Sequence, residues 1–353
     1  MKLEELDPRL TVKGKLVDRG YVFYDCEQPP FRVYGLLREG DHYCRMPRDV
    51  AQSVNEGVLS HHVDTAGGRV RFVTDSDFIA IRAEMNGIRL FSHMPLTASA
   101  GFDLYATCEA YTDRYCGTFV PPKEVEDFYE NEVHTGDRFE KTVTINFPMY
   151  SGVKRVLIGV QEGSTLKPAP DYRYEQPVLF YGSSITQGGC ASTPGSAYFS
   201  ILSRRLDCNI RNLGFSGSAK GEQTMIDYLC AQDMGVFVLD YDHNAPSPEH
   251  LRDTHEKLFL AVRAAHPDVP VIMMPRPKLY FITEKTRSRV DIVRQTYENA
   301  LAAGDKNVYF IDNVQLTELV GYAGTVDGTH PTDSGHLSMA NAVEGALKKA
   351  LGA

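Results

Sequence analysis

Short apolar segments alternate with amphipathic patterns through the second half of the chain, and this alternation limits the possible folds more than any other feature. The apolar segments read as strands near residues 178–182, 208–213, 235–241, 269–274 and 307–311. Helical patterns lie near residues 195–206, 221–231, 248–265, 284–303 and 333–351. Strands joined through helices pair in parallel, and right-handed crossovers put helices on both faces of the sheet. The pattern predicts an α/β fold with three α/β/α layers.

The first half of the chain, from about residue 10 to 165, has an all-β pattern. Apolar or alternating segments recur, with Gly67-Gly68 and Asn86-Gly87 between them as predicted turns. The segments are Tyr21–Tyr24, Phe31–Tyr34, Val70–Val73, Phe78–Ile81, Thr142–Ile145 and Val156–Val160. Their spacing and β-branched content predict a sandwich or barrel.

A proline-rich, polar stretch separates the two patterns. It runs through Leu166–Asp171 and is followed by Pro177. A length of 353 residues also favours two domains over one. We therefore predict a β domain over residues 1–170 and an α/β domain over residues 171–353.

Charge and cysteine content exclude several classes of protein. The net charge of −9 argues against nucleic acid or an anionic membrane surface as the main partner. No apolar run approaches the length of a membrane span, and the charged segment Met1–Asp7 does not resemble a signal peptide. The seven scattered cysteines include no C-x-x-C and indicate reduced thiols in a cytoplasmic protein. A homo-oligomer remains open.

Four polar segments of the second half fall at strand ends or in the loops that follow. They are Gly182-Ser183-Ser184, Asn212–Gly217, Asp240–Pro246 and Val326–Pro331. In a doubly wound sheet, the carboxyl ends of neighbouring strands meet at one crevice. Each segment taken alone is more often an ordinary turn or a helix cap. Their order, one in each strand–helix unit, predicts a shared site.

The residue types in these segments are those that acyl transfer needs. A serine hydroxyl needs an adjacent base, and His330 is suitable because an imidazole titrates near neutral pH. Asp327, three residues earlier, can fix the imidazole tautomer. An oxyanion needs N–H donors, which the backbone of Gly214, the backbone of Ser184 and the side chain of Asn244 can offer.

On these residues the second half resembles the SGNH hydrolases, also called GDSL-type esterases. Ser184, Gly214, Asn244 and His330 match the four residues that name the family, and Asp327-x-x-His330 matches its D-x-x-H. The resemblance implies a flavodoxin-like sandwich in which Ser184 is the nucleophile, His330 the base and Asp327 its orienter. It also implies an oxyanion hole from Ser184 N–H, Gly214 N–H and the Asn244 amide.

The first half carries a second resemblance. Gly101-Phe102-Asp103-Leu104-Tyr105 is similar to the G-x-D-L-Y signature of a β-sandwich domain that precedes one branch of SGNH enzymes. The two resemblances together cover most of the chain. They imply a layout like that of carbohydrate esterases in which a jelly-roll domain stands ahead of the SGNH domain.

The sequence departs from the family pattern at two places. The usual G-D-S is Gly182-Ser183-Ser184 here, which leaves Ser183 as an alternative nucleophile. The usual G-x-N-D is Asp242-His243-Asn244-Ala245, so an acid replaces the glycine.

Candidate substrate-binding residues are Arg276, Asp242 and Tyr105. Arg276 can bind a polar substrate group or pair with an acid, and Tyr105 can fill the β core or line a cleft. His243, with Asp240 and Asp242 nearby, is a candidate metal ligand, but no second ligand pair is evident and a loop-lining role is favoured. We expect neither a metal nor an organic cofactor.

The combined interpretation is a serine esterase that acts on short acyl groups. By resemblance the substrate is an acetyl ester of a sugar or oligosaccharide, cleaved in the cytoplasm through an acyl-serine intermediate. An acyltransferase with the same Ser–His–Asp residues is one alternative. A non-catalytic carbohydrate-binding protein on a hydrolase scaffold is the other.

Overall fold

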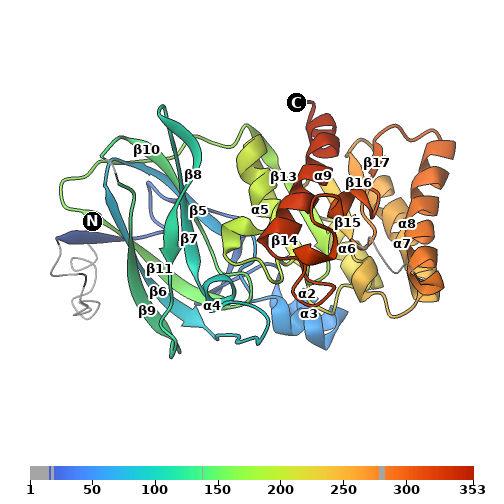
Figure 1. The fold of residues 1–353 in the computed structure, drawn as a ribbon, viewed down its shortest axis with the longest axis horizontal. Coiled ribbons are helices and arrows are strands. Elements are labelled where there is room, and N and C mark those ends of the chain that lie inside the picture. Colours follow the sequence, from blue (N-terminus) through green and yellow to red (C-terminus); the bar gives the residue numbers. More distant parts are fainter. Residues whose placement is uncertain (1–15, 17–19, 137, 278–282) are drawn as a thin grey trace. The chain divides into compact units, whose positions relative to one another are not determined.

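The computed structural model describes residues 16, 20–136, 138–277 and 283–353 (Figure 1). The segment Met1–Asp7, for which the sequence predicts no signal peptide, lies outside the described residues. The chain forms two compact units. Unit 1 consists of Met1–Arg45, Val63–Asp171 and Ser192–Gly195, and unit 2 of Met46–His62, Tyr172–Ala191 and Ser196–Ala353. The main change of unit falls between Asp171 and Tyr172, next to the predicted boundary at 170/171. Two short segments do not follow that boundary, because Met46–His62 belongs to unit 2 and Ser192–Gly195 to unit 1.

Unit 1 is built from antiparallel sheets, as the first half of the sequence predicts. One sheet has the strand order β1-β11-β6-β9, and the other has the order β12-β5-β10-β7-β8 with β2 paired to β5. A separate small sheet pairs β3 with β4. The bounds are β1 (Tyr21–Asp25), β2 (Arg32–Tyr34), β3 (Leu37–Glu39), β4 (His42–Cys44), β5 (Arg69–Thr74), β6 (Phe78–Asn86), β7 (Phe102–Cys108), β8 (Tyr111–Phe119), β9 (Phe128–His134), β10 (Lys141–Asn146), β11 (Gly152–Gln161) and β12 (Leu166–Lys167), with the short helix α4 (Leu96–Ser99) before β7.

Both large sheets contribute to one hydrophobic core. Ile81 of β6 and Ile158 of β11 come from the first sheet, and Phe72, Leu104 and Val143 come from the second. Side chains alternate between the two faces of a strand, so each strand offers every second residue to this core. A shared core between two antiparallel sheets is the arrangement of a β-sandwich.

The G-x-D-L-Y residues hold the segment Ser192–Gly195 within unit 1. The fully buried carboxylate of Asp103 accepts hydrogen bonds from Asn146 Nδ2 at 2.8 Å and from the backbone N–H of Gly195 at 2.6 Å. A Cβ on Gly195 would lie 2.2 Å from the ring of Tyr105, so only glycine fits against this ring. Tyr105 is buried and also packs on Tyr115, with ring centroids 5.5 Å apart. The motif therefore has a structural role in this unit.

Unit 2 contains a parallel five-stranded sheet. Its strand order is β14-β13-β15-β16-β17, which is the doubly wound order 2-1-3-4-5. The strands are β13 (Tyr174–Gly182), β14 (Cys208–Gly214), β15 (Val236–Asp240), β16 (Val271–Met273) and β17 (Val308–Phe310). All five lie where the apolar segments predict them, and the predicted α/β fold is confirmed.

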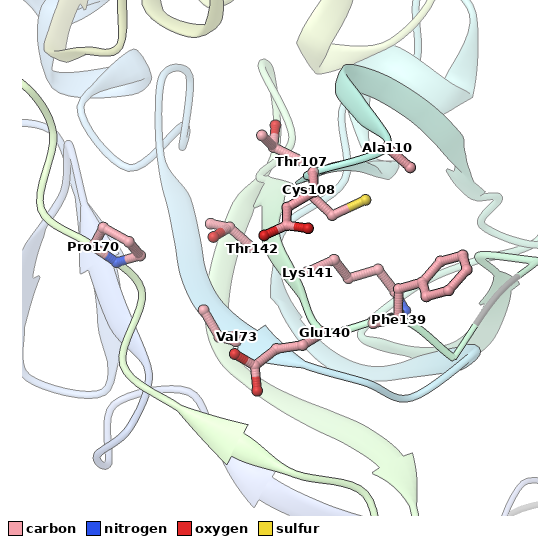
Figure 2. Close-up of a pocket in the computed structure, with 10 residues that line it drawn as sticks. Val73, Thr107, Cys108, Ala110, Phe139, Glu140, Lys141, Thr142 and Pro170 are labelled. Atoms are coloured by element: carbon pink, nitrogen blue, oxygen red, sulfur yellow. Dashed lines mark hydrogen bonds between the residues drawn. The ribbon is translucent and has the colours of Figure 1, made fainter.

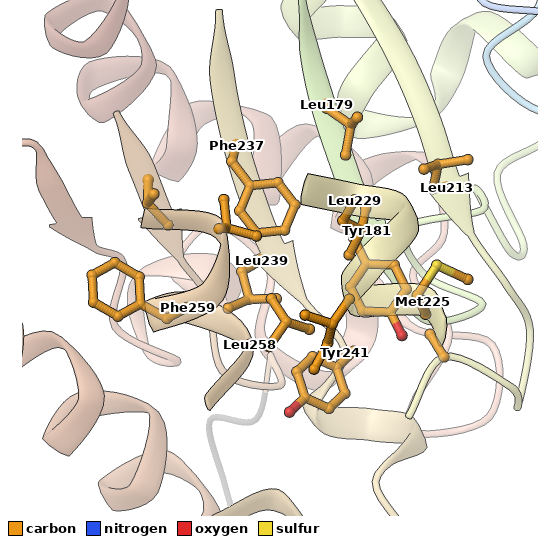
Figure 3. Packing of buried hydrophobic residues seen from close by; sticks show 14 of the residues in the cluster. Leu179, Tyr181, Leu213, Met225, Leu229, Phe237, Leu239, Tyr241, Leu258 and Phe259 are labelled. Carbon is orange, nitrogen blue, oxygen red and sulfur yellow. The ribbon is translucent and has the colours of Figure 1, made fainter. Parts of the chain in front are cut away.

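Helices cover both faces of this sheet (Figure 1). They are α5 (Tyr198–Leu206), α6 (Gln223–Cys230), α7 (Pro248–Ala265), α8 (Glu284–Ala302) and α9 (Asp333–Leu351). Capping residues set two of the starts, because Ser247 accepts a hydrogen bond from His250 N–H and Thr283 accepts one from Thr286 N–H. Figure 3 shows strand residues such as Leu179 and Leu239 packed with residues of α6 and α7 such as Leu229 and Leu258.

Besides the short α4, two helices among the described residues of the first half depart from the all-β prediction. They are α2 (Arg48–Val54) and α3 (Glu56–His61), and both belong to unit 2. Ala51 and Val58 are fully buried in the core of that unit. Asn55 accepts from Val58 N–H at 2.9 Å as a helix cap, while its Nδ2 donates to Ser218 O at 3.0 Å. No helix among the described residues is long and apolar enough to cross a membrane.

Candidate active site

The segment Tyr181–Cys190, which contains the end of β13 and the turn after it, is buried along its whole length, and we call it the serine loop. The N–H of Ser183 donates to Asp240 O at 3.2 Å, and the N–H of Gly189 donates to Ser184 O at 2.7 Å. From the neighbouring strand, Asn212 Nδ2 donates to Thr186 O at 2.6 Å. The apolar strand ends at Gly182, where a Cβ would lie 2.1 Å from the Thr186 hydroxyl. The loop is thus fixed by the two strands that flank β13 in the sheet.

The two neighbouring serines have different surroundings. Ser184 keeps 8% of its surface exposed, and its Oγ lies 2.9 Å from Nε2 of His330. Ser183 is fully buried, and its Oγ accepts a hydrogen bond from Ile185 N–H at 3.2 Å. The geometry therefore favours Ser184 as the nucleophile over Ser183.

The loop before α9 brings the acid and the base together. Nδ1 of His330 lies 2.7 Å from Oδ2 of Asp327. Oδ1 of Asp327 accepts from the backbone N–H of Thr329 at 2.9 Å and from that of His330 at 2.8 Å. Burial acts to raise the pKa of Asp327, but the hydrogen bonds from His330 and Thr329 outweigh it and lower the pKa to about 2.

The tautomer of His330 follows from its partners. An ionised carboxylate only accepts, so the hydrogen lies on Nδ1 and Nε2 is left to accept from the Ser184 hydroxyl. The alternative that Asp327-x-x-His330 merely caps α9 does not fit, since that helix begins at Asp333 with Thr332 at its N-cap position.

Gly214 does not have the free N–H that the sequence suggests. Its N–H donates to Oδ1 of Asn212 at 2.9 Å. The residue instead allows close packing, because a Cβ here would lie 2.3 Å from the backbone nitrogen of Gln187. Its absent side chain therefore lets β14 approach the serine loop.

Gly217, three residues further on, offers a backbone N–H that the sequence analysis did not consider. It lies exposed in the same turn with φ at +66°, and among the described residues its N–H has no hydrogen-bond partner. The preceding residue, Ser216, is anchored through its N–H to Oε1 of Gln187 at 3.0 Å. In the sequence, Ser216-Gly217 is a pair of small residues past the end of the predicted strand, which is a pattern typical of a turn with an accessible backbone N–H.

Asn244 lies in a short 3₁₀ turn, η4 (Asp242–Asn244), after β15. Its Nδ2 donates to Phe215 O at 2.8 Å, in the loop that holds Gly217. A primary amide carries two hydrogens on nitrogen, so this bond leaves one for another acceptor. The Asn244 turn and the Gly217 turn therefore lie side by side.

Arg276 and Asp242, two of the candidate substrate-binding residues, bind each other. Nε of Arg276 lies 3.0 Å from Oδ2 of Asp242, whose side chain is 1% exposed. Burial acts to raise the pKa of Asp242, but the hydrogen bonds and charge of Arg276 outweigh it and lower that pKa. Of the two roles left open for Arg276, the structure shows the ion pair. Tyr105, the third candidate, is buried in unit 1.

Asp240 holds two hydroxyl groups beneath the serine loop. Its Oδ2 accepts from Thr186 Oγ1 at 2.8 Å and from the Tyr198 hydroxyl at 3.3 Å. Burial raises the pKa of Asp240 to about 8. This carboxyl therefore holds the serine loop through the hydroxyl of Thr186.

His336 of α9 supports the other end of the serine loop. Its Nδ1 accepts from the N–H of Tyr198 at 3.4 Å, which leaves Nε2 to donate to Gly189 O at 3.2 Å. Full burial lowers the pKa of His336 to about 4, so the ring is neutral at pH 7.

Unit 1 contains a hollow of about 560 Å³ on its own surface (Figure 2). The ammonium of Lys141 donates to Phe139 O at 3.0 Å, and the carboxylate of Glu140 pairs with Lys167. The lining residues are Val73, Thr107, Cys108, Glu109, Ala110, Phe139, Glu140, Lys141, Thr142 and Pro170, and none of these ten is a histidine.

Comparison with sequence families identifies both halves of the chain. Residues 175–348 match the GDSL-like lipase/acylhydrolase family. Residues 21–166 match the GxDLY family, described as the N-terminus of SGNH-hydrolase-type esterases. A search of curated proteins finds no match.

Solved structures share the fold over nearly the whole chain. A protein from Bacteroides ovatus described as a GDSL-like lipase has 26% sequence identity and a TM-score of 0.83, covering 94% of this chain and 98% of its own. The salicylyl-acyltransferase SsfX3 of a tetracycline biosynthetic pathway has 18% identity and a TM-score of 0.75, covering 95% and 98%. The acetyl xylan esterase Est2A of Butyrivibrio proteoclasticus has 12% identity and a TM-score of 0.60, covering 94% and 99%.

The two sequence matches follow one another along the chain, and the second contains the Ser184, Asn244, Asp327 and His330 described above. The chain belongs to the GDSL-like lipase/acylhydrolase family of SGNH-type esterases, with the GxDLY domain at its N-terminal side.

Proposed function

We propose that the protein is a serine esterase in which Ser184, His330 and Asp327 form the catalytic triad. The observation that carries the proposal is the continuous set of contacts from Ser184 Oγ to His330 Nε2 at 2.9 Å and from His330 Nδ1 to Asp327 Oδ2 at 2.7 Å. This is the arrangement in which an imidazole removes the hydroxyl proton as the oxygen attacks.

The reaction has two stages. Ser184 Oγ attacks the ester carbonyl carbon while His330 takes its proton, and the proton then passes to the leaving alkoxide as the C–O bond breaks. Water next attacks the acyl-serine and gives its proton to His330, which returns it to Ser184 as the acid leaves. Throughout, Asp327 stabilises the charged imidazole.

The oxyanion is stabilised by the backbone N–H of Ser184, the second amide hydrogen of Asn244 and the N–H of Gly217. Gly217 takes the role that the sequence gives to Gly214, because the Gly214 N–H is bound to Asn212. The bond from Asn244 to Phe215 O, at 2.8 Å, supports the placement of this amide beside the Gly217 turn. Removal of one oxyanion donor typically costs about 100- to 1,000-fold in kcat.

The proposed substrate is a short acyl ester, with an acetyl group on a sugar or oligosaccharide. The likeness in fold to the acetyl xylan esterase supports a carbohydrate as the alcohol part of the ester. The seven cysteines are all free, which agrees with a cytoplasmic site of action.

The test compares Ser184→Ala with Ser183→Ala on p-nitrophenyl acetate, butyrate and octanoate. We expect wild type to prefer acetate and S184A to lose about a millionfold in kcat, as removal of a triad nucleophile does. S183A removes one acceptor for Ile185 N–H and should retain kcat within about tenfold. If S184A retains the rate, the assignment of the triad is wrong. Release of acetate from acetylated xylo-oligosaccharides then tests the alcohol.

An acyltransferase is the second candidate, favoured by the likeness in fold to the salicylyl-acyltransferase. Both reactions pass through the same acyl-serine, and they differ only in whether water or an alcohol removes the acyl group. Product formation that needs an added sugar or alcohol acceptor, with little free acetate, would select the transferase. Absence of any covalent labelling of Ser184 by a fluorophosphonate would instead favour a non-catalytic binding protein.

A further inference from the structure

We propose that Asp242, Arg276 and Arg289 form a clamp that positions Asn244 for catalysis. The proposal rests on the proposed function of Asn244 as an oxyanion donor. It assigns the two arginines and the acid a positioning role, in place of the substrate-binding role that the sequence suggests for Arg276 and Asp242. We call these three residues the arginine clamp.

Both oxygens of the Asp242 carboxylate are held within the clamp. Oδ2 accepts from the backbone N–H of Arg276 at 2.9 Å and from its Nε at 3.0 Å. Oδ1 accepts from Nη2 of Arg276 at 3.0 Å and from Nη1 of Arg289 at 3.2 Å. The carboxylate is therefore saturated by protein donors and is not available to a substrate.

The arginines also hold the backbone on both sides of Asn244. The carbonyl of Asp242 accepts from Arg276 Nη2 at 3.1 Å and from Arg289 Nη1 at 2.9 Å. The carbonyl of Ala245 accepts from Arg289 Nη2 at 2.8 Å. Between these anchors, Asn244 N–H donates to Tyr241 O at 2.9 Å. The turn that carries Asn244 is thus fixed before and after the residue itself.

The clamp joins three elements that are distant in the sequence. Asp242 follows β15, Arg276 follows β16, and Arg289 lies on α8. The side chains of Asp242 and Arg289 are 1% and 4% exposed, so two charged groups are removed from water to order a short turn. Buried ion pairs contribute little net stability compared with apolar packing, and here the two arginines also bind the backbone carbonyls of Asp242 and Ala245. A positioning role therefore explains the clamp better than a stabilising one.

Precision in this turn has a direct chemical consequence. An oxyanion donor works only if its hydrogen points to where the charge develops, and a displacement of about 1 Å can cost about 100-fold in rate. Asp242 replaces the glycine that the family pattern has two residues before this asparagine, and here the acid is the centre of the clamp. The departure from the pattern thus becomes a positioning device.

The test is a double-mutant cycle between the clamp and Asn244, with p-nitrophenyl acetate as substrate. We expect Arg276→Ala to lower kcat about 100-fold with KM changed less than about twofold. In the Asn244→Ala background the same change should lower kcat less than about threefold, because the donor that the clamp positions is already gone. Guanidinium ion added to Arg276→Ala should restore part of the rate.

Two further variants distinguish a loss of positioning from misfolding. Arg276→Lys and Asp242→Asn keep much of the packing but lose the paired hydrogen bonds, and both should show the same loss of kcat on a smaller scale. Arg263→Ala is the matched control: its Nε lies 2.7 Å from Asp305 Oδ2, and its Nη1 donates to Val269 O at 2.6 Å. It should lower the melting temperature and leave kcat unchanged.

Different outcomes overturn different claims. Additive losses in the cycle, with Asn244→Ala itself impaired, would overturn the clamp and leave the proposed function standing. A rise in KM at constant kcat would show that Arg276 binds substrate. Full activity of Asn244→Ala would remove the oxyanion role on which the clamp depends, while activity of Ser184→Ala would remove the proposed function itself.

Discussion

The two loops that meet at the site are held in opposite ways. The serine loop is buried along its length and is fixed by groups from other elements, including Asp240, Asn212 and His336. The loop around Asp327 and His330 is exposed or half-buried, and hydrogen bonds between its own residues hold it. Examples are Val326 N–H to His330 O at 3.0 Å and Gly328 N–H to Thr325 Oγ1 at 3.0 Å.

Because of this difference, changes in the two loops should affect stability and activity differently. A change in the serine loop disturbs the core of unit 2, so stability and activity should fall together. A change in the histidine loop alters groups at the surface, so activity should fall while the fold remains. Ser184 is therefore positioned by the sheet, and His330 is positioned by its own turn.

The largest expected effect on activity comes from a change in the exposed loop that carries Asp327 and His330. Asp327→Asn should lower kcat about ten-thousandfold, because an amide leaves His330 in the wrong tautomer. The melting temperature should stay within about 2 °C of wild type, since the Asp327 side chain is 40% exposed. Steady-state kinetics and thermal unfolding on the same sample check this. Asp333→Asn, an exposed acid at the start of α9, is the control. A large loss of stability in D327N would contradict the contrast.

The second effect is expected on the buried side. Gly214→Ala places a Cβ 2.3 Å from the backbone nitrogen of Gln187, so strand or loop must move. Overpacking of this kind costs about 1–3 kcal/mol, and activity should fall with it. Gly345→Ala in α9 meets no atom within 4 Å and should be neutral or slightly stabilising. Chemical denaturation measures both, and a stable but inactive G214A would break the comparison.

The third effect concerns acid stability. Burial lowers the pKa of His336 to about 4 from an ordinary 6.5, so the unfolded chain binds the proton more readily between these values. The contribution of His336 to the free energy of unfolding is fully present above pH 6.5. It is lost as the pH falls toward 4, by about 3 kcal/mol. His336→Asn should make the decline shallower.

His255 of α7 offers a matched comparison for this third effect. Its pKa is also lowered to about 4 by burial, but its Nδ1 contacts Thr296 at 2.9 Å, on α8 rather than on the serine loop. His255→Asn should flatten the pH dependence of unfolding to a similar extent. Only His336→Asn should also lower kcat at pH 7, and equal losses in both variants would argue against a specific link to the serine loop.

The sequence predicts regular elements well and pairings less well. The strands and helices of unit 2 follow from apolar periodicity, which depends on local sequence alone. The nearness of Ser184 and His330 follows from the rule that parallel strands end at one edge. The pairing of Asp242 with Arg276 and Arg289 depends on how a strand end faces the start of α8, and no local pattern encodes that.

Two other differences have the same origin. The choice between Gly214 and Gly217 depends on a side-chain contact, because the N–H of Gly214 is already bound to the carboxamide oxygen of Asn212. The helices α2 and α3 lie in a segment of ordinary helical pattern within an all-β region, and only tertiary packing assigns them to unit 2. Periodicity says which side of an element is apolar but not which core will cover it.

The interleaving of the units has a consequence for proteolysis. A single cut between Asp171 and Tyr172 would give two polypeptides, yet the N-terminal fragment would keep Met46–His62 in the core of unit 2. The C-terminal fragment would likewise keep Ser192–Gly195 bound to Asp103. The nicked protein should therefore show two bands on a denaturing gel but migrate as one species under native conditions. Modular exchange of either half by recombination at the linker would leave both recipients incomplete.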